Sequence, residues 1–358
     1  MSKKQKCKPN FIKKTKGVKS ERTRKILEIQ REWTEQLKKC DEVELYIIKS
    51  TVIIAGTCTG FVSNRIIRDV EFDYVIVDEA AKATFPELAV SLNKAHKIIL
   101  VGDHQQLPPV LDTEIIRNNK EKLDEEGLAQ GIFERMYNMF PEDNKHRLTI
   151  QYRMHPTIGT LISHVFYNDE IQNGVEAQDR ELCIEGYEGI AIEWISTSKY
   201  STKERYEKEF DNNGKKSYQN YLERNIIERK LLELDSKLVK RTKIAVITGY
   251  GSQKYILQTM VKQHSFKHIE VDVDTVDAFQ GSQKDIILYS TVRSSGNKYG
   301  IGFLKSEARI NVAFSRARCL LIIVGDMKFL DNYKIRGNKF PEIIKYITES
   351  EGCRIIEK

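Results

Sequence analysis

Long hydrophobic runs are missing from this chain of 358 residues. No apolar stretch approaches the roughly 18 residues of a membrane-spanning helix, so the sequence predicts no membrane partner. The N-terminus is basic and has no apolar core, so no secretory signal is expected there. The six cysteines include no CxxC pair, a pattern that favours reduced thiols over a disulfide framework. Together these absences predict a cytoplasmic protein.

Positive charge is concentrated at the start of the chain. Residues 1–25 hold eleven Lys or Arg and one acid, a local charge of +10 in a chain whose formal charge is +7. A basic arm of this kind can bind nucleic-acid phosphates by releasing their counterions. The alternative is a solvated terminal segment without a partner, because Phe11 is the only aromatic residue there that could stack on a base.

Strands and helices are predicted to alternate after an N-terminal helix over residues 19–49. Short apolar runs predict strands at "TVIIAG" (51–56), "DYVIVDEA" (73–80) and "HKIILVGD" (96–103). A Lys/Glu-rich stretch and "GLAQGIFERMYNMFP" then predict a helical insertion over about 112–147. Continuous apolar strands are typical of parallel sheets covered on both faces, so the sequence predicts an α/β fold.

A second α/β pattern begins at Leu148. Residues 196–216 are polar and without periodicity, and they predict a surface loop. Strands are expected at 190–195, 243–248, 271–276, 285–292 and 319–326. Helices are expected near 156–168, 218–235, 252–264 and 306–317.

Two acids follow the second predicted strand directly. In "YVIVDEAAKATFPELA", Asp78 and Glu79 come immediately after Val77. A carboxylate at a strand end can hold Mg²⁺, largely through water, and a second acid can orient or deprotonate an attacking water. The alternative is that these acids only cap the helix that follows.

Polar residues at later strand ends favour the first interpretation. "GDHQQLPPV" offers the amide of Gln106 on a loop stiffened by two prolines, and "QYRMHP" offers Arg153. "TVDAFQGSQKD" contains a Gln-Gly turn, and "ARINVAFSRAR" carries Arg316 between two other arginines. An arginine that reaches a terminal phosphate can stabilise transition-state charge, although one arginine alone more often forms a surface ion pair.

The series DEAA, GDHQQLPP, QYRMHP, VDAFQG and NVAFSRAR resembles the superfamily 1 helicases of the 5′→3′ branch. These AAA-type ATPases include the helicase of nonsense-mediated decay and senataxin. The resemblance runs from about Thr51 to Met327, most of the chain. It implies two RecA-like parallel-sheet domains that bind ATP and Mg²⁺ between them and hold single-stranded DNA or RNA across their top.

The resemblance also implies the domain organisation and the role of each site residue. We expect a basic arm and helix (1–49), a first RecA-like domain with a helical insertion (50–147), a second domain (148–335) and a C-terminal tail (336–358). The implied catalytic residues are Asp78, which is also the metal ligand, Glu79 as base and Arg316 as arginine finger. The implied nucleotide-binding residues are Gln106, Arg153, Gln280, Gly281 and Gln283. The implied nucleic-acid contacts are Thr57, Asn220, Thr248, Tyr250 and Thr275.

The sequence departs from the family in two ways that bear on activity. Gln283 stands where the family usually has a Glu that contacts the nucleotide ribose, so an amide replaces a charge. No GxxxxGK[ST] phosphate-binding loop precedes Asp78, where the only glycines are Gly17, Gly56 and Gly60. That loop supplies the backbone N–H groups and the Lys that hold the phosphates. The strand that leads into it is absent with it, so the first domain is expected to be incomplete, with an open sheet edge.

Three functions remain open from the sequence. The chain can be part of an ATP-dependent helicase, completed by a phosphate-loop segment that a separate chain supplies, with negligible hydrolysis by residues 1–358 alone. It can be a nucleic-acid-binding module that does not hydrolyse ATP. It can also be a fragment of a helicase gene without function of its own.

Overall fold

The computed structural model describes residues 21–37, 41–68, 70–110, 131–212, 215–295 and 300–357. The chain divides into two compact units, Met1–Asp78 with Phe85–Leu100 and Glu79–Thr84 with Val101–Lys358. The basic arm up to residue 20 and the Lys/Glu-rich part of the predicted insertion lie outside the described residues. The division into units differs from the predicted boundary at 147/148, which stays a prediction. In the described ranges, no helix has the length and apolar character needed to cross a bilayer.

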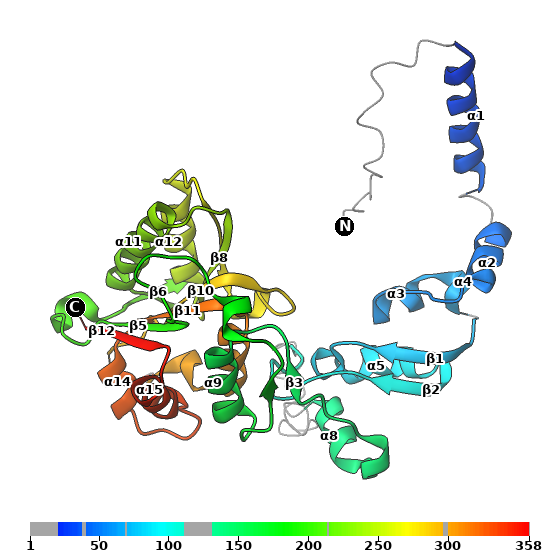
Figure 1. Ribbon diagram of the computed structural model, residues 1–358. Helices are drawn as coiled ribbons and strands as arrows, with labels where there is room; N and C mark the ends of the chain where they lie inside the picture. The colour runs from blue at the N-terminus through cyan, green and yellow to red at the C-terminus, as the bar shows by residue number, and fades with distance from the viewer. Residues whose placement is uncertain are drawn as a thin grey trace. The chain divides into compact units, whose positions relative to one another are not determined.

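The first unit contains short helices and one pair of parallel strands (Figure 1). β1 pairs in parallel with β2, so that Ile76 lies opposite Ile99. The predicted helix over 19–49 is two helices in the described residues. The elements of this unit are α1 (Glu21–Leu37), α2 (Asp41–Ser50), α3 (Cys58–Ser63), α4 (Arg65–Arg68), β1 (Phe72–Val77), α5 (Phe85–Leu92) and β2 (Ala95–Leu100).

The strand predicted at 51–56 does not form, and that prediction is wrong. These residues are extended but pair with no strand in the part of the chain that the structure describes. Val52 is 98% exposed and Ile53 is 81% exposed. A strand is stabilised by a hydrogen-bonded neighbour, and apolar β-branched residues alone do not supply one.

The second unit is organised around a six-stranded parallel sheet in the order β12-β5-β11-β10-β8-β9. Every neighbouring pair in it is parallel, so the predicted α/β class is confirmed. The five strands predicted after Leu148 are all present. The strands of this sheet are β5 (Ile192–Ser196), β8 (Thr242–Thr248), β9 (Ile269–Thr275), β10 (Lys284–Ser290), β11 (Ala317–Gly325) and β12 (Cys353–Glu357).

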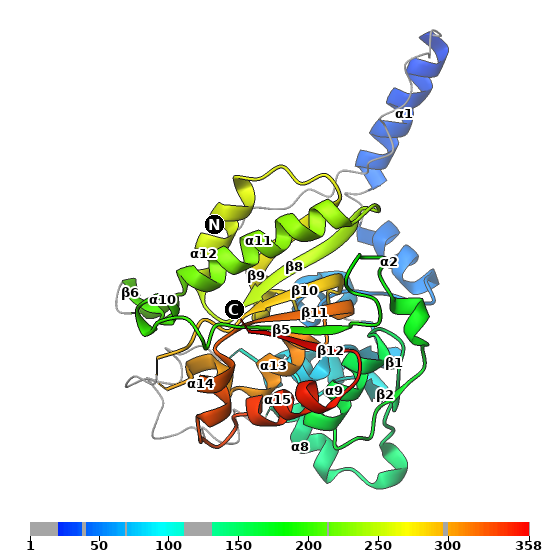
Figure 2. The same cartoon turned by 60° about the vertical axis from the view of Figure 1, so that its left-hand side comes forward.

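Helices cover both faces of this sheet, with α11 and α12 on one face and the others opposite (Figure 2). Side chains alternate between the two cores: Ile322 packs toward α11 and α12, whereas Leu321 and Ile323 pack on the other face. Both faces are therefore apolar, as continuous hydrophobic strands predict. The long covering helices are α9 (Pro156–Phe166), α11 (Tyr221–Lys237), α12 (Gly251–Lys262), α13 (Glu307–Phe314), α14 (Met327–Asn332) and α15 (Phe340–Glu349).

Shorter elements connect or flank this sheet in the second unit. Two of them, β3 and β4, pair in parallel outside the main sheet. α8 lies within the predicted helical insertion. The shorter elements are η1 (Ala80–Lys82), α8 (Ile132–Met139), η2 (Glu142–Asn144), β3 (Ile150–Gln151), β4 (Gln172–Asn173), η3 (Ala177–Arg180), α10 (Thr202–Arg205), β6 (Lys208–Asn212), β7 (Lys215–Gln219), η4 (Val276–Ala278) and η5 (Gly302–Lys305).

Residues 336–358 are not the tail that the sequence predicts. They form α15 and the edge strand β12, which pairs in parallel with β5. An ion pair joins the two strands. Glu193 of β5 is completely buried and accepts from Nε of Arg354 of β12 at 3.0 Å. Lys230 lies 3.2 Å from the same carboxylate. A buried charge needs partners of this kind; β12 supplies Arg354, and α11 supplies Lys230.

The surface loop predicted at 196–216 is also wrong, because much of it forms an antiparallel hairpin of β6 and β7. Glu207 anchors the hairpin: its carboxylate accepts from the backbone N–H groups of Ser294 and Ser295 at 2.9 Å each. A polar strand with most side chains exposed carries no hydrophobic alternation, so the sequence pattern could not identify it.

The position of α15 gives a test of the C-terminal fold. Phe340 is completely buried and stacks edge-on against Trp194 of β5, with ring centroids 6.0 Å apart. We expect Phe340→Ala to lower the free energy of unfolding by about 3–5 kcal/mol, the usual cost of removing a buried phenyl ring. Lys345→Ala, on the exposed side of the same helix, should change it by less than about 0.5 kcal/mol. Urea unfolding would measure both, and equal small effects would mean that residues 336–358 are a tail after all.

Candidate functional site

The turn after β1 carries the two predicted acids. Asp78 closes the first unit and Glu79 begins the second, and both are exposed. Glu79 has a left-handed backbone with φ 55° and ψ 34°, which costs free energy in any residue other than Gly. The N–H of Ala80 donates to the carbonyl of Val101 at 2.8 Å. The backbone at Glu79 is thus tied to the segment that carries Gln106.

Gly102 allows that close approach. A side chain there would bring its Cβ within 2.8 Å of the backbone nitrogen of Ala81, a distance at which the two segments would have to separate. Gly102 is therefore required by the packing of two loops. Beyond it, Leu107 is buried in the core of the second unit and anchors the loop that carries Gln106.

The QYRMHP segment is braced by its own first residue. The side chain of Gln151 accepts from the backbone N–H groups of Arg153 and Met154 at 2.9 and 2.8 Å. Arg180 donates to the carbonyls of Arg153 and Tyr152 at 2.9 and 2.7 Å. These hydrogen bonds hold the backbone of Arg153 from both sides, so its side chain extends from a constrained backbone position.

Arg316 lies in the turn after α13, because the helix ends at Phe314 and not at 317 as the sequence predicts. Its side chain is 2% exposed. Nη2 donates to Oε1 of Gln106 at 3.1 Å, and Nε donates to the carbonyl of Val312 at 3.1 Å. The structure thus brings together Gln106 and Arg316, which are 210 residues apart in sequence.

Two arginines share this buried region. Burial lowers the pKa of Arg316 to about 10, and repulsion from Arg153 contributes to the shift. Burial likewise lowers the pKa of Arg153, against the attraction of Glu79. Nη1 of Arg153 donates to the carbonyl of Ser315 at 3.3 Å. Two guanidinium groups that repel one another in a desolvated place favour an anion that can accept from both.

The Gln-Gly turn reaches the same place from the other side. Nε2 of Gln280 donates to Oε2 of Glu79 at 3.3 Å. Its Oε1 is buried and has no hydrogen-bond partner among the described residues. Gly281 has φ +79° with open space around it, so the backbone conformation requires glycine there. Gln283 is exposed beyond the turn.

These five side chains fit the end of a phosphate chain. Arg153 and Arg316 supply positive charge, Gln106 and Gln280 supply amide groups, and Glu79 supplies a carboxylate that could hold a water. The unpartnered Oε1 of Gln280 is an acceptor that could take a hydrogen bond from a water at the site. Among the described residues no group of three or more His, Cys, Asp or Glu side chains could hold a metal ion. A Mg²⁺ bound by Asp78 and otherwise by water and phosphate would not need such a group.

Of the predicted nucleic-acid contacts, two threonines meet at the carboxyl edge of the six-stranded sheet. Thr248 ends β8 and lies opposite Thr275, which ends β9. Thr248 is completely buried, and its hydroxyl has no partner among the described residues. Thr275 is half-buried. Thr57 belongs to the first unit, where its hydroxyl accepts from the N–H of Gly60 at 3.1 Å and caps α3.

The other two predicted contacts have their polar groups committed inside the protein. Tyr250 is 3% exposed, and its hydroxyl accepts from the N–H of Phe303 at 3.3 Å. Asn220 is completely buried and donates from Nδ2 to the carbonyls of Arg205 and Val292 at 2.8 and 3.0 Å. Direct contact between either residue and a nucleic-acid strand would require these hydrogen bonds to break. In this structure Asn220 and Tyr250 instead hold neighbouring backbone segments in position.

Glu223 is the centre of that buried network. Its carboxylate accepts from the N–H of Val292 at 2.9 Å, and from the hydroxyls of Ser290 and Thr291 at 2.6 and 3.1 Å. Val292 has φ +69°, a strained conformation for a β-branched residue. The carboxylate and Asn220 hold this strained turn at the end of β10.

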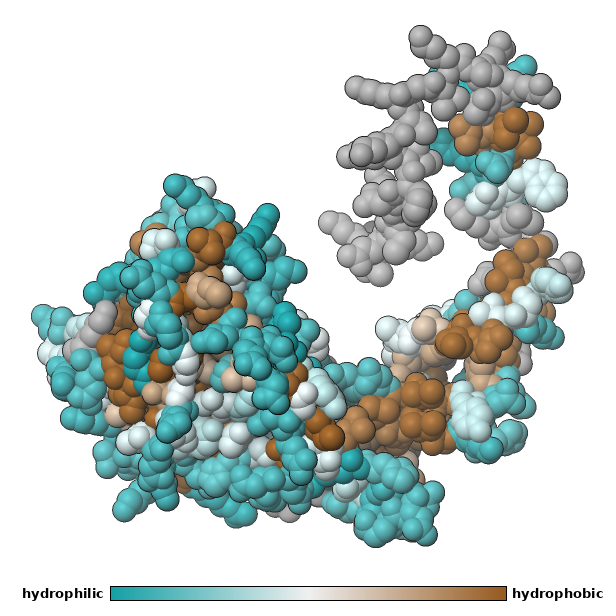
Figure 3. All heavy atoms as spheres, in the orientation of Figure 1, coloured by the Kyte–Doolittle hydropathy of each residue, from teal (hydrophilic) through white to brown (hydrophobic). Residues whose placement is uncertain are grey.

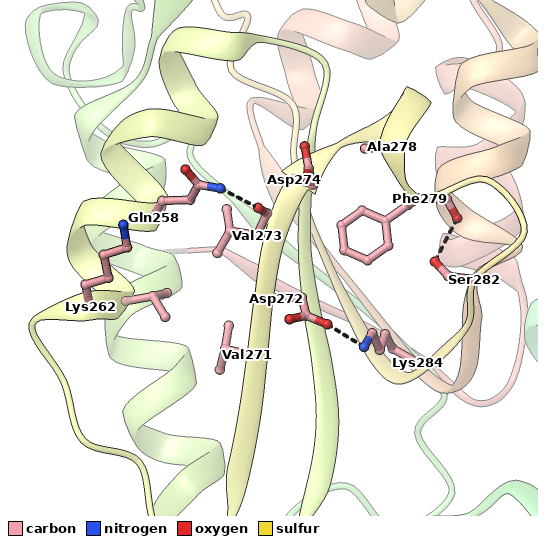
Figure 4. Close-up of a pocket in the computed structure, with 11 residues that line it drawn as sticks. Gln258, Lys262, Val271, Asp272, Val273, Asp274, Ala278, Phe279, Ser282 and Lys284 are labelled. Atoms are coloured by element: carbon pink, nitrogen blue, oxygen red, sulfur yellow. Dashed lines mark hydrogen bonds and ion pairs between the residues drawn. The ribbon is translucent and has the colours of Figure 1, made fainter. Parts of the chain in front are cut away.

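A hollow of about 470 Å³ lies along the edge strand β9, between α12 and residues 276–284 (Figure 4). Lys284 and Asp272 form an ion pair of 2.5 Å within it, and Nε2 of Gln258 donates to the carbonyl of Val273 at 2.9 Å. No predicted site residue lines it, and the charges of Asp272, Asp274 and Lys284 are already paired. The candidate site is therefore the region around Gln106 and Arg316.

Sequence reasoning missed the residues that hold the site in place. Asp103, Gln151 and Asn311 lie within the motifs already quoted, where a polar residue near a predicted contact was the available signal. Tyr167 and Arg180 are brought to the site by tertiary structure alone, from the end of α9 and from a 3-10 turn.

The network around Glu223 predicts a dependence of stability on pH. Burial raises the pKa of Glu223 to about 8, above the value of about 4.3 in an unfolded chain. The folded state then binds more protons between these values, so stability should fall as pH rises through 8. Glu223→Gln is neutral throughout and should flatten this dependence between pH 5 and pH 9. Urea unfolding of both proteins across that range checks it, and parallel curves would contradict it.

Comparison with known proteins identifies the family of this chain. Two family models, both described as an AAA domain, match residues 2–114 and 128–328. The chain is similar to the ATP-dependent helicase NAM7 of Saccharomyces cerevisiae, 35% identical over 324 residues, which is 89% of this chain and 31% of NAM7. It is 34% identical over 301 residues to the regulator of nonsense transcripts 1 homolog of Neurospora crassa, which is 82% of this chain and 26% of that protein.

An archaeal relative is similar over a larger share of its length. An uncharacterized ATP-dependent helicase of Methanocaldococcus jannaschii is 29% identical over 358 residues, which is 95% of this chain and 48% of that protein. The chain spans less than half the length of each of these relatives. It therefore belongs to the AAA-domain family, as a superfamily 1 helicase chain similar to NAM7 and the regulators of nonsense transcripts.

Proposed function

We propose that this chain is part of an ATP-dependent helicase and supplies the residues that meet the terminal phosphate of ATP. The observation that carries the proposal is the pair of repelling arginines, Arg153 and Arg316, gathered with Gln106 and Gln280 in one buried place. Such a pair is stabilised by an anion that accepts from both. The relatives named as ATP-dependent helicases make the γ-phosphate the best candidate for that anion.

The proposed role of each residue follows from the motif that contains it. Asp78 would hold Mg²⁺, which would neutralise phosphate charge. Glu79 would orient and deprotonate the attacking water, and Gln280 would hold its carboxylate in place. Arg316, docked on Gln106, would stabilise the charge that develops on the transferred phosphoryl group. Gly281 and Gln283 would lie along the nucleotide beyond that point.

A phosphate-binding loop would have to come from outside residues 1–358, from a separate chain or another segment. The first unit offers a place for it. β1 and β2 keep one face uncovered, with Tyr74, Ile76 and Ile99 exposed by 53, 66 and 45%, and hydrophobic side chains gather over these strands (Figure 3). Parallel strands are normally covered on both faces. A segment that adds to this sheet would bury these residues and bring the phosphate loop with it.

Single-stranded DNA or RNA is the proposed polymer, and ATP hydrolysis would be coupled to movement along it. The support is the alignment of Thr248 and Thr275 at the carboxyl edge of the sheet, where open parallel sheets bind ligands. The basic N-terminal arm would add phosphate contacts. A nucleic-acid-binding module without hydrolysis is the second candidate, favoured by the same observation together with the absence of a phosphate loop from these residues.

We also propose a cytoplasmic location. Cys58, Cys183, Cys319 and Cys353 are free thiols in the structure, as expected in a reducing compartment. The other two cysteines lie outside the described residues.

Discrimination between nucleotides tests the phosphate site without requiring turnover. Because the site meets the end of a phosphate chain, we expect MgATP to bind this chain at least about tenfold more tightly than MgADP, the effect of one or two charge-assisted hydrogen bonds. Arg316→Ala should remove that preference. Isothermal titration calorimetry with both nucleotides measures it.

The matched control is Arg318→Ala. Arg318 lies two residues further on, forms an ion pair of 3.0 Å with Asp285 and does not contact Gln106. It should keep the preference for MgATP. Equal affinities for the two nucleotides in the unmodified chain, or equal losses in both variants, would refute the proposed phosphate site.

Salt dependence tests the proposed polymer. Affinity for a single-stranded oligonucleotide should fall linearly on a log–log plot against salt, with a slope of about −0.7 for each phosphate contacted. Replacing the Lys and Arg of residues 1–25 by Gln should reduce the slope without abolishing binding. Fluorescence anisotropy with DNA and RNA oligonucleotides of the same sequence measures both. Millimolar affinity that does not respond to salt would rule the polymer out.

A further inference from the structure

Asp103 lies behind Gln106 and dictates how its amide is turned. Oδ2 of Asp103 accepts from Nε2 of Gln106 at 2.7 Å, and Oδ1 accepts from the backbone N–H of Gln105 at 3.0 Å. An ionised carboxylate only accepts hydrogen bonds, so the NH₂ group of Gln106 must face Asp103. Its carbonyl oxygen then faces Nη2 of Arg316, which donates to it at 3.1 Å. The reverse orientation would set Nε2 against a guanidinium and Oε1 against a carboxylate.

Two residues from other elements hold Asp103 in that place. The hydroxyl of Tyr167, at the end of α9, donates to Oδ2 of Asp103 at 2.5 Å. Nδ2 of Asn311, on α13, donates to the hydroxyl oxygen of Tyr167 at 2.8 Å and to the carbonyl of Gln105 at 3.0 Å. Tyr167 is 9% exposed and Asn311 is completely buried. The chain of contacts thus runs from α13 through Tyr167, Asp103 and Gln106 to Arg316.

Burial fixes which group donates and which accepts along this series of hydrogen bonds. Burial and the neighbouring Asp103 raise the pKa of Tyr167 well above its ordinary value, so its hydroxyl remains a donor at neutral pH. A buried polar group that loses its partner costs more than an exposed one. Each member therefore constrains the next, and the orientation of Gln106 is decided 61 residues away along the chain, at Tyr167.

We propose that Asp103, held by Tyr167 and Asn311, is a positioning residue that turns the Gln106 amide to dock Arg316 and so sets the recognition of a terminal phosphate. The effect on phosphate recognition rests on the proposed function. The docking itself does not, because it is a property of the folded second unit. With its NH₂ group turned to Asp103 and Tyr167 and its carbonyl given to Arg316, Gln106 has both ends of its amide fixed.

Two substitutions separate this role from general stability. Tyr167→Phe removes the hydroxyl that holds Asp103 and leaves the ring in place. Tyr346→Phe is the matched control: its hydroxyl donates to the carbonyl of Thr157 on α9 at 3.0 Å, and it lies outside the chain of contacts. Tyr167→Phe removes a hydrogen bond to a carboxylate and Tyr346→Phe removes one to a backbone carbonyl, so the comparison rests on coupling to Gln106 and not on the total loss of stability.

The first measurement is a double-mutant cycle that needs no nucleotide. Tyr167→Phe, Gln106→Met and the double variant are unfolded in urea, followed by fluorescence of the buried Trp194. The two changes should be non-additive by a factor of at least about 3 in the unfolding equilibrium constant, as expected of residues in one hydrogen-bond network. The same cycle with Tyr346→Phe should be additive. An additive Tyr167–Gln106 cycle overturns the proposal whatever the nucleotide result.

The second measurement is the ratio of MgATP to MgADP affinity. Tyr167→Phe should reduce the ratio about threefold to tenfold, the effect of one misplaced hydrogen bond, and Tyr346→Phe should leave it unchanged. Asp103→Asn should reduce it at least as far, because an amide accepts at only one end, so its NH₂ group must oppose either the N–H of Gln105 or the donors of Gln106 and Tyr167. An unchanged ratio in Tyr167→Phe, alongside a loss in Arg316→Ala, overturns the effect on recognition. Coupling in the cycle without any preference for MgATP in the unmodified chain supports the docking and rejects the proposed function.

Discussion

The six strands of the large sheet all run in one direction, and the rest of the second unit depends on that constraint. A parallel sheet buries both faces, so its strands are apolar along their length and polar only at their ends. Because the strands are parallel, their carboxyl ends share one edge. Thr248, Thr275 and Ser290 therefore end neighbouring strands. The turns that hold Gln280 and Arg316 lead into β10 and β11 of the same sheet.

Polar groups that cannot reach water dominate the chemistry around this sheet. Glu193, Glu223 and Arg316 are each nearly or fully buried. The protein stabilises each of these three groups in a different way. Glu193 is neutralised by Arg354 and Lys230, Glu223 has a raised pKa and accepts from backbone and hydroxyl donors, and Arg316 is docked on an amide beside another arginine. The first two arrangements are satisfied within the protein. The third retains like-charge repulsion that a bound anion would relieve, and this repulsion is the basis of the proposed phosphate site.

The accuracy of prediction from sequence follows the kind of signal each segment carries. Every strand of the second sheet up to β11 was predictable, because a buried parallel strand is a continuous run of Val, Ile and Leu. The hairpin β6–β7 was not, since its residues are polar and it is anchored by Glu207 rather than by apolar packing. Residues 51–56 are the opposite case, an apolar run that forms no strand. α15 and β12 were overlooked because they follow the last recognisable motif, although α15 buries Phe340 and Ile343.

The sequence by itself determined the family and the α/β class, and it predicted the side chains of the proposed phosphate site, because motifs and hydrophobic runs are local properties. Only the tertiary structure decided how those side chains act. It showed Arg316 beyond the end of α13 and docked on Gln106, and it buried Asn220 and Tyr250 behind the strand ends. It also joined Asp103 to Tyr167 and Asn311, which no pattern in the chain connects. Hydrogen-bond partners and desolvation depend on residues far apart in sequence, so they exist only once the sheet and its covering helices have packed.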